Sequence, residues 1–206
     1  MKNLYDNYIG YISKKIKINN KFKPTHKIKT LKSQIYIGSD KKRIKPSNKW
    51  LPFGSKLMII KKNKNFIMFE KNQWIKFSDI CLISMKDKNY VKIFKLFINC
   101  PYKWGGKTYE GIDCSALIQI FYKFNNKFFP RDTIDQISKK IGSKTKKIFK
   151  KGDIIFWKGH VAVCINSSNL IHAYGPKKKV VIMPINKTIK RIEKTAKLKV
   201  KKVFKI

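Results

Sequence analysis

The chain has 206 residues and a formal net charge of +38, and only three of its 49 basic residues are arginine. A hydrophobic fraction of 43%, with 14 phenylalanines, can fill the core of one medium domain and a smaller one, so the composition excludes global disorder. The charge would suit nucleic acid, an anionic membrane surface or an acidic polymer. The lysines are scattered, however, and accompany abundant Ile, Asn and Phe, which indicates an AT-rich coding sequence, and we expect no nucleic-acid partner.

The four cysteines, Cys81, Cys100, Cys114 and Cys164, are irregularly spaced and form no CxxC pair. We therefore expect neither a structural zinc site nor a disulfide framework, and we predict no metal and no cofactor. Free thiols are compatible with a reducing compartment.

Residues 1–24 are polar and rich in Asn and Lys, and we predict an extended arm there. Neither this segment nor a later one holds an apolar run of the length that a signal peptide or a membrane span needs. The expected location is the cytoplasm, with export by a route independent of a signal peptide left open. We expect the protein to be a monomer.

Short runs of alternating apolar and polar residues fill 25–84 and are separated by turns that contain Gly, Pro or Asn. Several strands at this spacing predict a small antiparallel all-β barrel. Residues 73–76, followed by Asp79-Ile80, are similar to the closing strand and turn of bacterial SH3-like domains. We interpret Trp50 and Trp74 as core aromatics of this barrel, the more frequent fate of such residues.

Residues 85–99 carry apolar side chains at helical spacing and predict a first helix that ends before Pro101. After a loop, a second apolar-periodic segment begins at Cys114 and continues to about Asn125. The first N–H groups of a helix have no partners inside it, and the helix dipole is positive there, so a thiolate is favoured. Cys114 is therefore a candidate nucleophile rather than a packing residue.

Two of the three histidines, His160 and His172, lie on neighbouring strand-like runs in the last third of the chain. A cysteine on a helix that faces two such histidines is the arrangement that nucleophilic cysteine catalysis requires. Each histidine taken alone can equally be a satisfied core residue. A helix is predicted near Thr133, capped by Asp132, and another at 188–195. Strands are predicted at 154–157, 160–166, 169–173, 180–184 and 198–204. Helices followed by a meander predict an α+β domain.

The order and spacing of these motifs resemble the NlpC family of bacterial cell-wall cysteine peptidases, whose fold is papain-like. The match covers about residues 88–206, and Ala116 stands where the family usually has glycine. The matching residues are Tyr102, Gly105-Gly106, Asp113-Cys114-Ser115, Pro130-Arg131-Asp132-Thr133 with Gln136, Gly152-Asp153, His160 and His172.

The resemblance implies an α+β protein, in which an NlpC-type domain at 85–206, with helices packed on an antiparallel sheet, follows an SH3-like barrel at 25–84. The implied activity is hydrolysis of the γ-D-glutamyl–diamino acid bond in peptidoglycan stem peptides. Free murein peptides with an unblocked N-terminal L-Ala are the expected substrate, and intact cell wall is the alternative. In the first case the SH3-like domain would narrow the cleft.

The resemblance also implies roles for single residues. Cys114 would attack the peptide carbonyl, His160 would act as general base, and His172 would orient His160. The hydroxyl of Tyr102 would stabilise the oxyanion together with the backbone N–H of Cys114, while Arg131 can instead be structural. The implied catalytic residues are Cys114, His160 and His172, and the implied substrate contacts are Tyr102, Asp113 (the free α-amine), Ser115 and Thr133.

Two functions from other classes remain open at this stage. A non-catalytic basic module would bind an anionic polymer in a salt-sensitive way, and its binding would not need Cys114. A thiol acyltransferase would use the same Cys and His, but such enzymes usually carry the His before the Cys.

Overall fold

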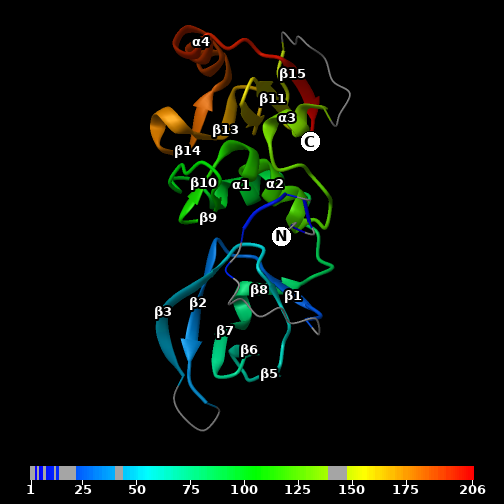
Figure 1. Ribbon diagram of the computed structural model, residues 1–206, viewed down its shortest axis with the longest axis vertical. Helices are drawn as coiled ribbons and strands as arrows, with labels where there is room; N and C mark the ends of the chain where they lie inside the picture. Colours follow the sequence, from blue (N-terminus) through cyan, green and yellow to red (C-terminus); the bar gives the residue numbers. More distant parts are fainter. Residues whose placement is uncertain are drawn as a thin grey trace. The chain divides into compact units, whose positions relative to one another are not determined.

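The structure is a computed structural model that describes residues 3, 5–6, 8–11, 13, 22–39, 44–138 and 148–206. The chain divides into two compact units, coloured mainly blue to teal and green to red in Figure 1. The first unit comprises residues 9–88 and 124–126, and the second comprises residues 2–8, 89–123 and 127–206. The predicted N-terminal arm is thus divided between them, and its residues 14–21 lie outside the described part of the chain.

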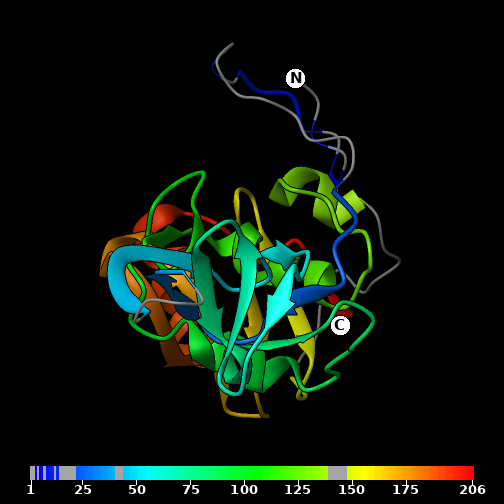
Figure 2. The same ribbon diagram turned by 90° about the horizontal axis from the view of Figure 1, so that it is seen from below.

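Among its described residues, the first unit consists of β-strands and loops, with one turn of 3-10 helix and a helical residue at Phe124. Five strands form an antiparallel sheet in the order β3-β2-β7-β6-β5, and three form a second sheet in the order β4-β1-β8 (Figures 1 and 2). The elements are β1 (His26–Ile28), β2 (Lys32–Ile37), β3 (Lys45–Pro52), β4 (Lys56–Leu57), β5 (Lys61–Lys62), β6 (Phe66–Glu70), β7 (Gln73–Lys76), η1 (Phe77–Asp79) and β8 (Ile80–Leu82).

Isoleucines dominate the core of the first unit. Ile28, Ile67 and Ile75 are fully buried, and the adjoining Leu57 and Ile80 are nearly so. β2 alternates buried and more exposed residues along its length, as expected for a sheet with one face in a core and one face toward water. The predicted all-β character is confirmed. Trp74 is buried as predicted, whereas Trp50 is 36% exposed with the Lys32 ammonium 4.4 Å from its ring centroid.

The second unit packs helices on a five-stranded antiparallel sheet with the strand order β14-β13-β12-β11-β15. The α+β class is therefore confirmed. The elements are α1 (Tyr90–Leu96), β9 (Lys107–Thr108), β10 (Gly111–Ile112), α2 (Cys114–Phe124), α3 (Thr133–Ser138), β11 (Asp153–Trp157), β12 (His160–Cys164), β13 (Asn169–Tyr174), η2 (Gly175–Lys177), β14 (Lys179–Pro184), α4 (Ile185–Ala196) and β15 (Lys202–Lys205).

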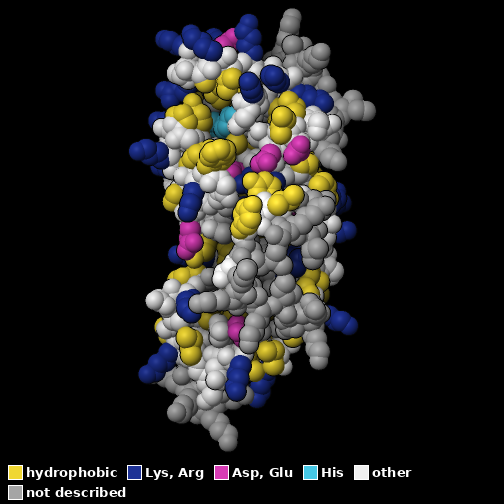
Figure 3. Space-filling model, in the orientation of Figure 1, with side chains coloured by type: hydrophobic (Ala, Val, Ile, Leu, Met, Phe, Trp, Pro, Cys, Tyr) yellow, Lys and Arg dark blue, Asp and Glu magenta, His cyan; other side chains and the backbone are white. Residues whose placement is uncertain are grey.

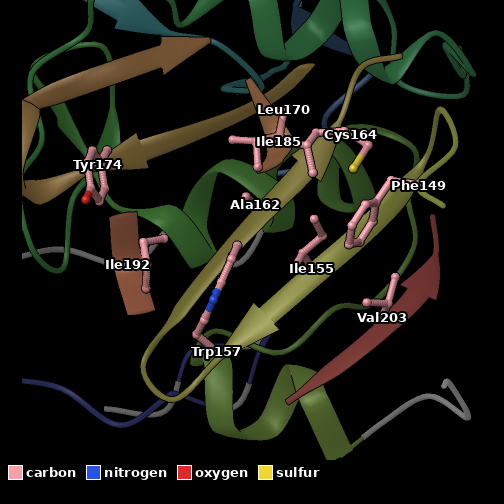
Figure 4. Packing of buried hydrophobic residues seen from close by; sticks show 10 residues of the cluster. All are labelled: Phe149, Ile155, Trp157, Ala162, Cys164, Leu170, Tyr174, Ile185, Ile192 and Val203. Atoms are coloured by element: carbon pink, nitrogen blue, oxygen red, sulfur yellow. The ribbon is translucent and has the colours of Figure 1, made fainter. Parts of the chain in front are cut away.

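The central strands of this sheet are buried on both faces. All five residues of β11 are buried, and the last four of β12 are as well. On one face, side chains such as Ile155, Ala162 and Leu170 form a continuous cluster with Ile185 and Ile192 of α4 (Figure 4). Strands covered on both faces read as nearly continuous apolar runs, which explains the sequence of β11.

A two-residue turn, Lys158-Gly159, joins β11 to β12. Gly159 has a φ of 74°, a conformation that glycine adopts without steric cost. The register pairs Trp157 directly with His160, so the turn sets the position of His160 at the start of β12. β13 then pairs with β12 and brings His172 beside it.

Some predicted boundaries shift. The helix expected from residue 85 begins at Tyr90, where the side chain of Asn89 accepts a hydrogen bond from the Lys92 N–H at 3.1 Å. The last strand begins at Lys202 rather than at residue 198. Within the described ranges, every helix is too short or too polar to span a bilayer.

Candidate active site

Cys114 is the first residue of α2 and is 5% exposed. The side chain of Asp113 accepts a hydrogen bond from the Ala116 N–H at 2.8 Å, and its carbonyl accepts one from the Leu117 N–H at 3.1 Å. Asp113 therefore caps the helix that carries the thiol, as short polar side chains do at helix starts. The helix start predicted from the apolar spacing after Cys114 is the one observed.

The thiol of Cys114 is buried more deeply than the sequence argument assumed. Burial raises the pKa of Cys114 to about 11, although the N–H groups of Val161, Ser115 and Cys114 itself act in the opposite direction. Desolvation of the thiolate therefore outweighs the helix terminus. In this state the sulfur is a thiol, and a base has to remove its proton during the reaction.

The interaction with Val161 also places the nucleophile relative to the sheet. Val161 follows His160 on β12, so the start of α2 lies against the strand at the residue after His160. Figure 3 shows a histidine surface on one face of the molecule, bordered by hydrophobic side chains.

The two histidines are hydrogen-bonded to each other. Nε2 of His160 lies 2.9 Å from Nδ1 of His172, and their ring centroids are 5.1 Å apart. The ring of Tyr174 stacks on His172 at 4.6 Å with an interplanar angle of 11°, and Trp157 lies 5.6 Å from His160. Because one nitrogen of His160 is engaged with His172, Nδ1 is the nitrogen that remains to exchange a proton with a nucleophile.

Both imidazoles are held neutral by their surroundings. Burial lowers the pKa of His160 to about 4. Burial also lowers the pKa of His172 far below its ordinary value, and a positive charge on His160 would lower it further. Cys114 and His160 are thus a neutral thiol and a neutral imidazole over most of the pH range.

Tyr102 lies beside the same thiol. Burial raises the pKa of Tyr102, and negative charge on Cys114 or Asp113 would raise it further, because both residues are near its hydroxyl. Its backbone N–H donates to the carbonyl of Lys178 at 2.8 Å, and its ring packs against Gly175. The structure therefore brings Tyr102 together with Cys114, and its role at the oxyanion remains a prediction.

Asp113, Ser115 and Arg131 form a buried ionic cluster next to the nucleophile. The guanidinium of Arg131 donates to both carboxylate oxygens of Asp113, at 3.0 and 2.5 Å, and to the hydroxyl of Ser115 at 2.7 Å. The N–H of Gly105 donates to Asp113 at 2.9 Å. The substrate contacts expected of Asp113 and Ser115 remain predictions, and both side chains already have partners within the protein. Arg131 makes the contacts expected of the structural role that the sequence also allowed.

A close approach of backbone holds the glycine loop against this cluster. A Cβ on Gly106 would lie 2.3 Å from the carbonyl oxygen of Gly111, so only glycine fits there. Gly106 also accepts a hydrogen bond from the N–H of Asp113 at 3.3 Å, through its carbonyl. The loop that carries Gly105 and Gly106 is thereby tied to the residue before the nucleophile.

Thr133, the remaining predicted substrate contact, is the half-buried first residue of α3. One turn later, Gln136 is fully buried and donates to the carbonyls of Ser115 and Pro130 at 3.0 and 2.9 Å. Gln136 thus joins α3 to the helix of the nucleophile, a role that its place after Pro130-Arg131-Asp132-Thr133 in the sequence did not reveal. Tyr174 and Met183, which contact His172, were also not identified from the sequence. The available signal was that Tyr174 lies two residues after His172 on the same strand, and so on the same face of the sheet.

Residues 99–197 match the model of the NlpC/P60 family. A γ-D-glutamyl-L-lysine dipeptidyl-peptidase of Bacillus cereus is 36% identical over 100 residues, which are 45% of this chain and 30% of the relative. A protein of the same name from Bacillus subtilis is 31% identical over 101 residues, covering 45% and 34% of the two chains. Dipeptidyl-peptidase 6 of Lysinibacillus sphaericus is 38% identical over 77 residues, covering 37% and 28%.

The chain matches about a third of the length of each of these curated relatives. Among solved structures, an NlpC/P60 family protein from Bacillus cereus superimposes with a TM-score of 0.65 at 24% identity. This alignment covers 79% of the present chain and 58% of the other, so the likeness in fold extends beyond the residues that the family model matches.

Proposed function

Residues 99–197 belong to the NlpC/P60 family, and from this premise we propose that the chain is a cysteine peptidase that hydrolyses the γ-D-glutamyl–diamino acid bond of peptidoglycan stem peptides. One observation carries the proposal. A cysteine at a helix start lies against the strand that begins with His160, and His160 is hydrogen-bonded at 2.9 Å to a second histidine. This combination supplies a nucleophile, a base and a group that orients the base.

In the proposed reaction, Nδ1 of His160 takes the proton of the Cys114 thiol as the sulfur attacks the peptide carbonyl carbon. The resulting oxyanion would be stabilised by the hydroxyl of Tyr102 and the backbone N–H of Cys114. The imidazolium of His160 then gives its proton to the leaving amine, the C–N bond breaks, and a thioester remains on Cys114. Water, deprotonated by His160, hydrolyses the thioester and restores the thiol.

The pKa values favour proton transfer during the attack over an ion pair formed beforehand. Because the pKa of Cys114 is about 11 and that of His160 about 4, transfer of the proton from the thiol to the imidazole is unfavourable in the resting site. Entry of substrate and growth of negative charge on the carbonyl oxygen would have to drive it. This agrees with a site in which hydrogen-bond donors are placed for the transition state rather than for a thiolate.

The substrate class rests on the names of the relatives, two of which are γ-D-glutamyl-L-lysine dipeptidyl-peptidases. Within that class we propose a free stem peptide with an unblocked N-terminal L-Ala as the preferred substrate. Intact peptidoglycan is the competing substrate. Since Asp113 is already paired with Arg131, it could hold the substrate amine only by sharing or exchanging these partners.

A direct test incubates the protein with three substrates and follows the products by mass spectrometry. The substrates are L-Ala-γ-D-Glu-diaminopimelate, the same peptide with an acetylated N-terminus, and intact sacculi. Release of the dipeptide L-Ala-D-Glu from the free peptide alone supports the proposal. Equal cleavage of sacculi would favour a wall hydrolase, and absence of cleavage in all three would refute the peptidase.

Cys114→Ala is the matched variant for this assay. We expect turnover to fall at least about 10⁴-fold, because the reaction loses its nucleophile. The substitution should leave the thermal unfolding midpoint close to that of the wild-type protein. Turnover at the wild-type rate would remove Cys114 from the mechanism.

A further inference from the structure

The second histidine of the site has a neighbour of its own. Sδ of Met183 lies 3.4 Å from Nε2 of His172, within the range of a hydrogen bond to sulfur. The β13–β14 register pairs His172 with Val181 and Leu170 with Met183, so Met183 is the diagonal neighbour of His172 across the two strands. Cys114, His160, His172 and Met183 thus come from α2, β12, β13 and β14.

The hydrogen bond between the two histidines leaves two arrangements of protons. In one, Nε2–H of His160 donates to Nδ1 of His172, and His172 carries its own proton on Nε2. In the other, Nδ1–H of His172 donates to Nε2 of His160, and His172 turns a bare lone pair toward Met183. The 2.9 Å distance is compatible with both.

The sulfur distinguishes between them. A thioether has lone pairs and no hydrogen, so it can accept a hydrogen bond but cannot donate one. His172 is 1% exposed, so water has little access to satisfy a misdirected nitrogen. The arrangement with Nε2–H of His172 facing Met183 makes two hydrogen bonds, whereas the other makes one and sets two lone pairs against each other.

We infer that Met183 is a positioning residue for the proposed hydrolysis: its thioether accepts the Nε2–H of His172 and thereby selects the tautomer in which Nδ1 of His160 is free to take the thiol proton. The inference rests on the proposed function for its catalytic consequence, but not for the tautomer itself. In the opposite tautomer Nδ1 of His160 would already carry a hydrogen and could not serve as base.

A neutral acceptor suits this position. A carboxylate beside His172 would favour the charged form of the imidazole, whereas the thioether directs a proton without adding charge. The chain of hydrogen bonds therefore orients His160 while both rings stay neutral. Stacking of Tyr174 on the face of His172 leaves the ring edge as its polar contact and keeps Nε2 aimed at the sulfur.

The tautomer can be read directly in the wild-type protein by long-range ¹H–¹⁵N NMR of the imidazoles at neutral pH. The chain has three histidines, so a His172→Gln variant assigns the signal. We expect the nitrogen shifts of His172 to report a proton on Nε2. A proton on Nδ1 would overturn the inference, whatever the protein does to murein peptides.

Two substitutions then test the sulfur. Met183→Leu keeps the volume and removes the acceptor, and such swaps are well tolerated in cores. We expect His172 to become a mixture of tautomers and kcat to fall about tenfold with KM unchanged, the scale of one net hydrogen bond. Met183→Gln supplies a carbonyl acceptor and should bring kcat to within about threefold of the wild-type value.

Met68→Leu, the same change on β6 of the first unit, is the control and should alter neither kcat nor the signal of His172. Wild-type kcat in Met183→Leu would overturn the inference. So would a loss of activity with the tautomer of His172 unchanged, because Met183 would then act through packing alone. Failure of the wild-type protein to cleave any murein peptide would count against the proposed function and leave the NMR result to decide on the tautomer.

Discussion

The two units of the chain bury their sheets in different ways. In the first, β2 alternates between the core and the surface, and Trp50, which pairs with Gln34 of β2, is partly exposed on the outer face. In the second, β11 and β12 are covered on both faces. A sheet with two covered faces can hold imidazoles away from water, which is what a neutral base requires, and a sheet with one open face cannot do so as readily.

The units also differ in how each satisfies a buried cation. Lys27 of the first unit is 2% exposed and donates to the carbonyls of Ile83 and Met85, which are neutral. Arg131 of the second unit is 6% exposed and faces the carboxylate of Asp113. Of these two buried cations, Arg131 is therefore matched by a charged group, whereas the two carbonyl partners of Lys27 are neutral.

Of the changes considered, replacing these two cations should have the largest effect on the free energy of unfolding. Arg131→Met leaves a carboxylate buried without its counter-charge, and we expect unfolding to become easier by about 3–5 kcal/mol. Lys27→Met removes a cation from neutral acceptors and should cost about 1–3 kcal/mol. Chemical denaturation of both variants measures the difference, and equal losses would mean that the ionic cluster contributes no more than ordinary hydrogen bonds.

The histidines should have an effect of intermediate size, on the pH dependence of kcat/KM. Because burial holds the pKa of His160 near 4, the neutral base persists as the pH falls through 6.5, the ordinary value for histidine. We expect kcat/KM to lose its base only near pH 4 and to fall about tenfold per pH unit below it. A pH–rate profile with a midpoint near 6.5 would show that His160 is solvated in the working enzyme.

The same shift has a consequence for stability. The unfolded chain, with a histidine pKa near 6.5, binds a proton more readily than the folded site. Stability should therefore decrease as the pH falls from about 6.5 toward about 4, on account of His160 and His172. His26 of the first unit is half-buried, and its pKa is lowered by burial and by the charge of Lys62. NMR titration of the three rings compares the two units directly.

Two glycines give the smallest and most closely matched test. Gly54 in the first unit and Gly159 in the second have φ values of 77° and 74°, and a Cβ at either would meet no atom within 4 Å. Gly→Ala at each should cost about 1 kcal/mol through backbone strain alone. Only Gly159→Ala should also lower kcat, because the turn sets His160 opposite Trp157. Thermal melting and turnover of both variants separate the two effects.

Periodicity predicted much of the second unit. The apolar spacing after Cys114 placed α2 within one residue at its C-terminal end, and alternating apolar runs located the strands of His160 and His172. The boundary expected at residue 85 was wrong because the residues just before Tyr90 are polar and Asn89 caps the helix. The boundary expected at residue 198 was wrong because Leu198 and Val200 alternate with lysine as in a strand, yet they pack against the core before β15 begins.

The finer chemistry of the site was less accessible. A thiol at a helix start predicts a favoured thiolate, but the pKa of Cys114 depends on how completely its sulfur is buried, which spacing does not reveal. The bond between Asp113 and Arg131 joins residues from separate segments, and the contact of His172 with Met183 depends on a strand register. Such pairings arise from the packed sheet and become visible only with it.

The burial of the cysteines governs how the protein meets electrophiles. Cys100, Cys114 and Cys164 are buried, whereas Cys81 on β8 is partly accessible. A small alkylating reagent added to the folded protein should therefore react first with Cys81 and not with the nucleophile. Because this early labelling leaves Cys114 intact, the amount of thiol lost would exceed the loss of activity. In a Cys81→Ser background, labelling would instead track the opening of the buried site itself.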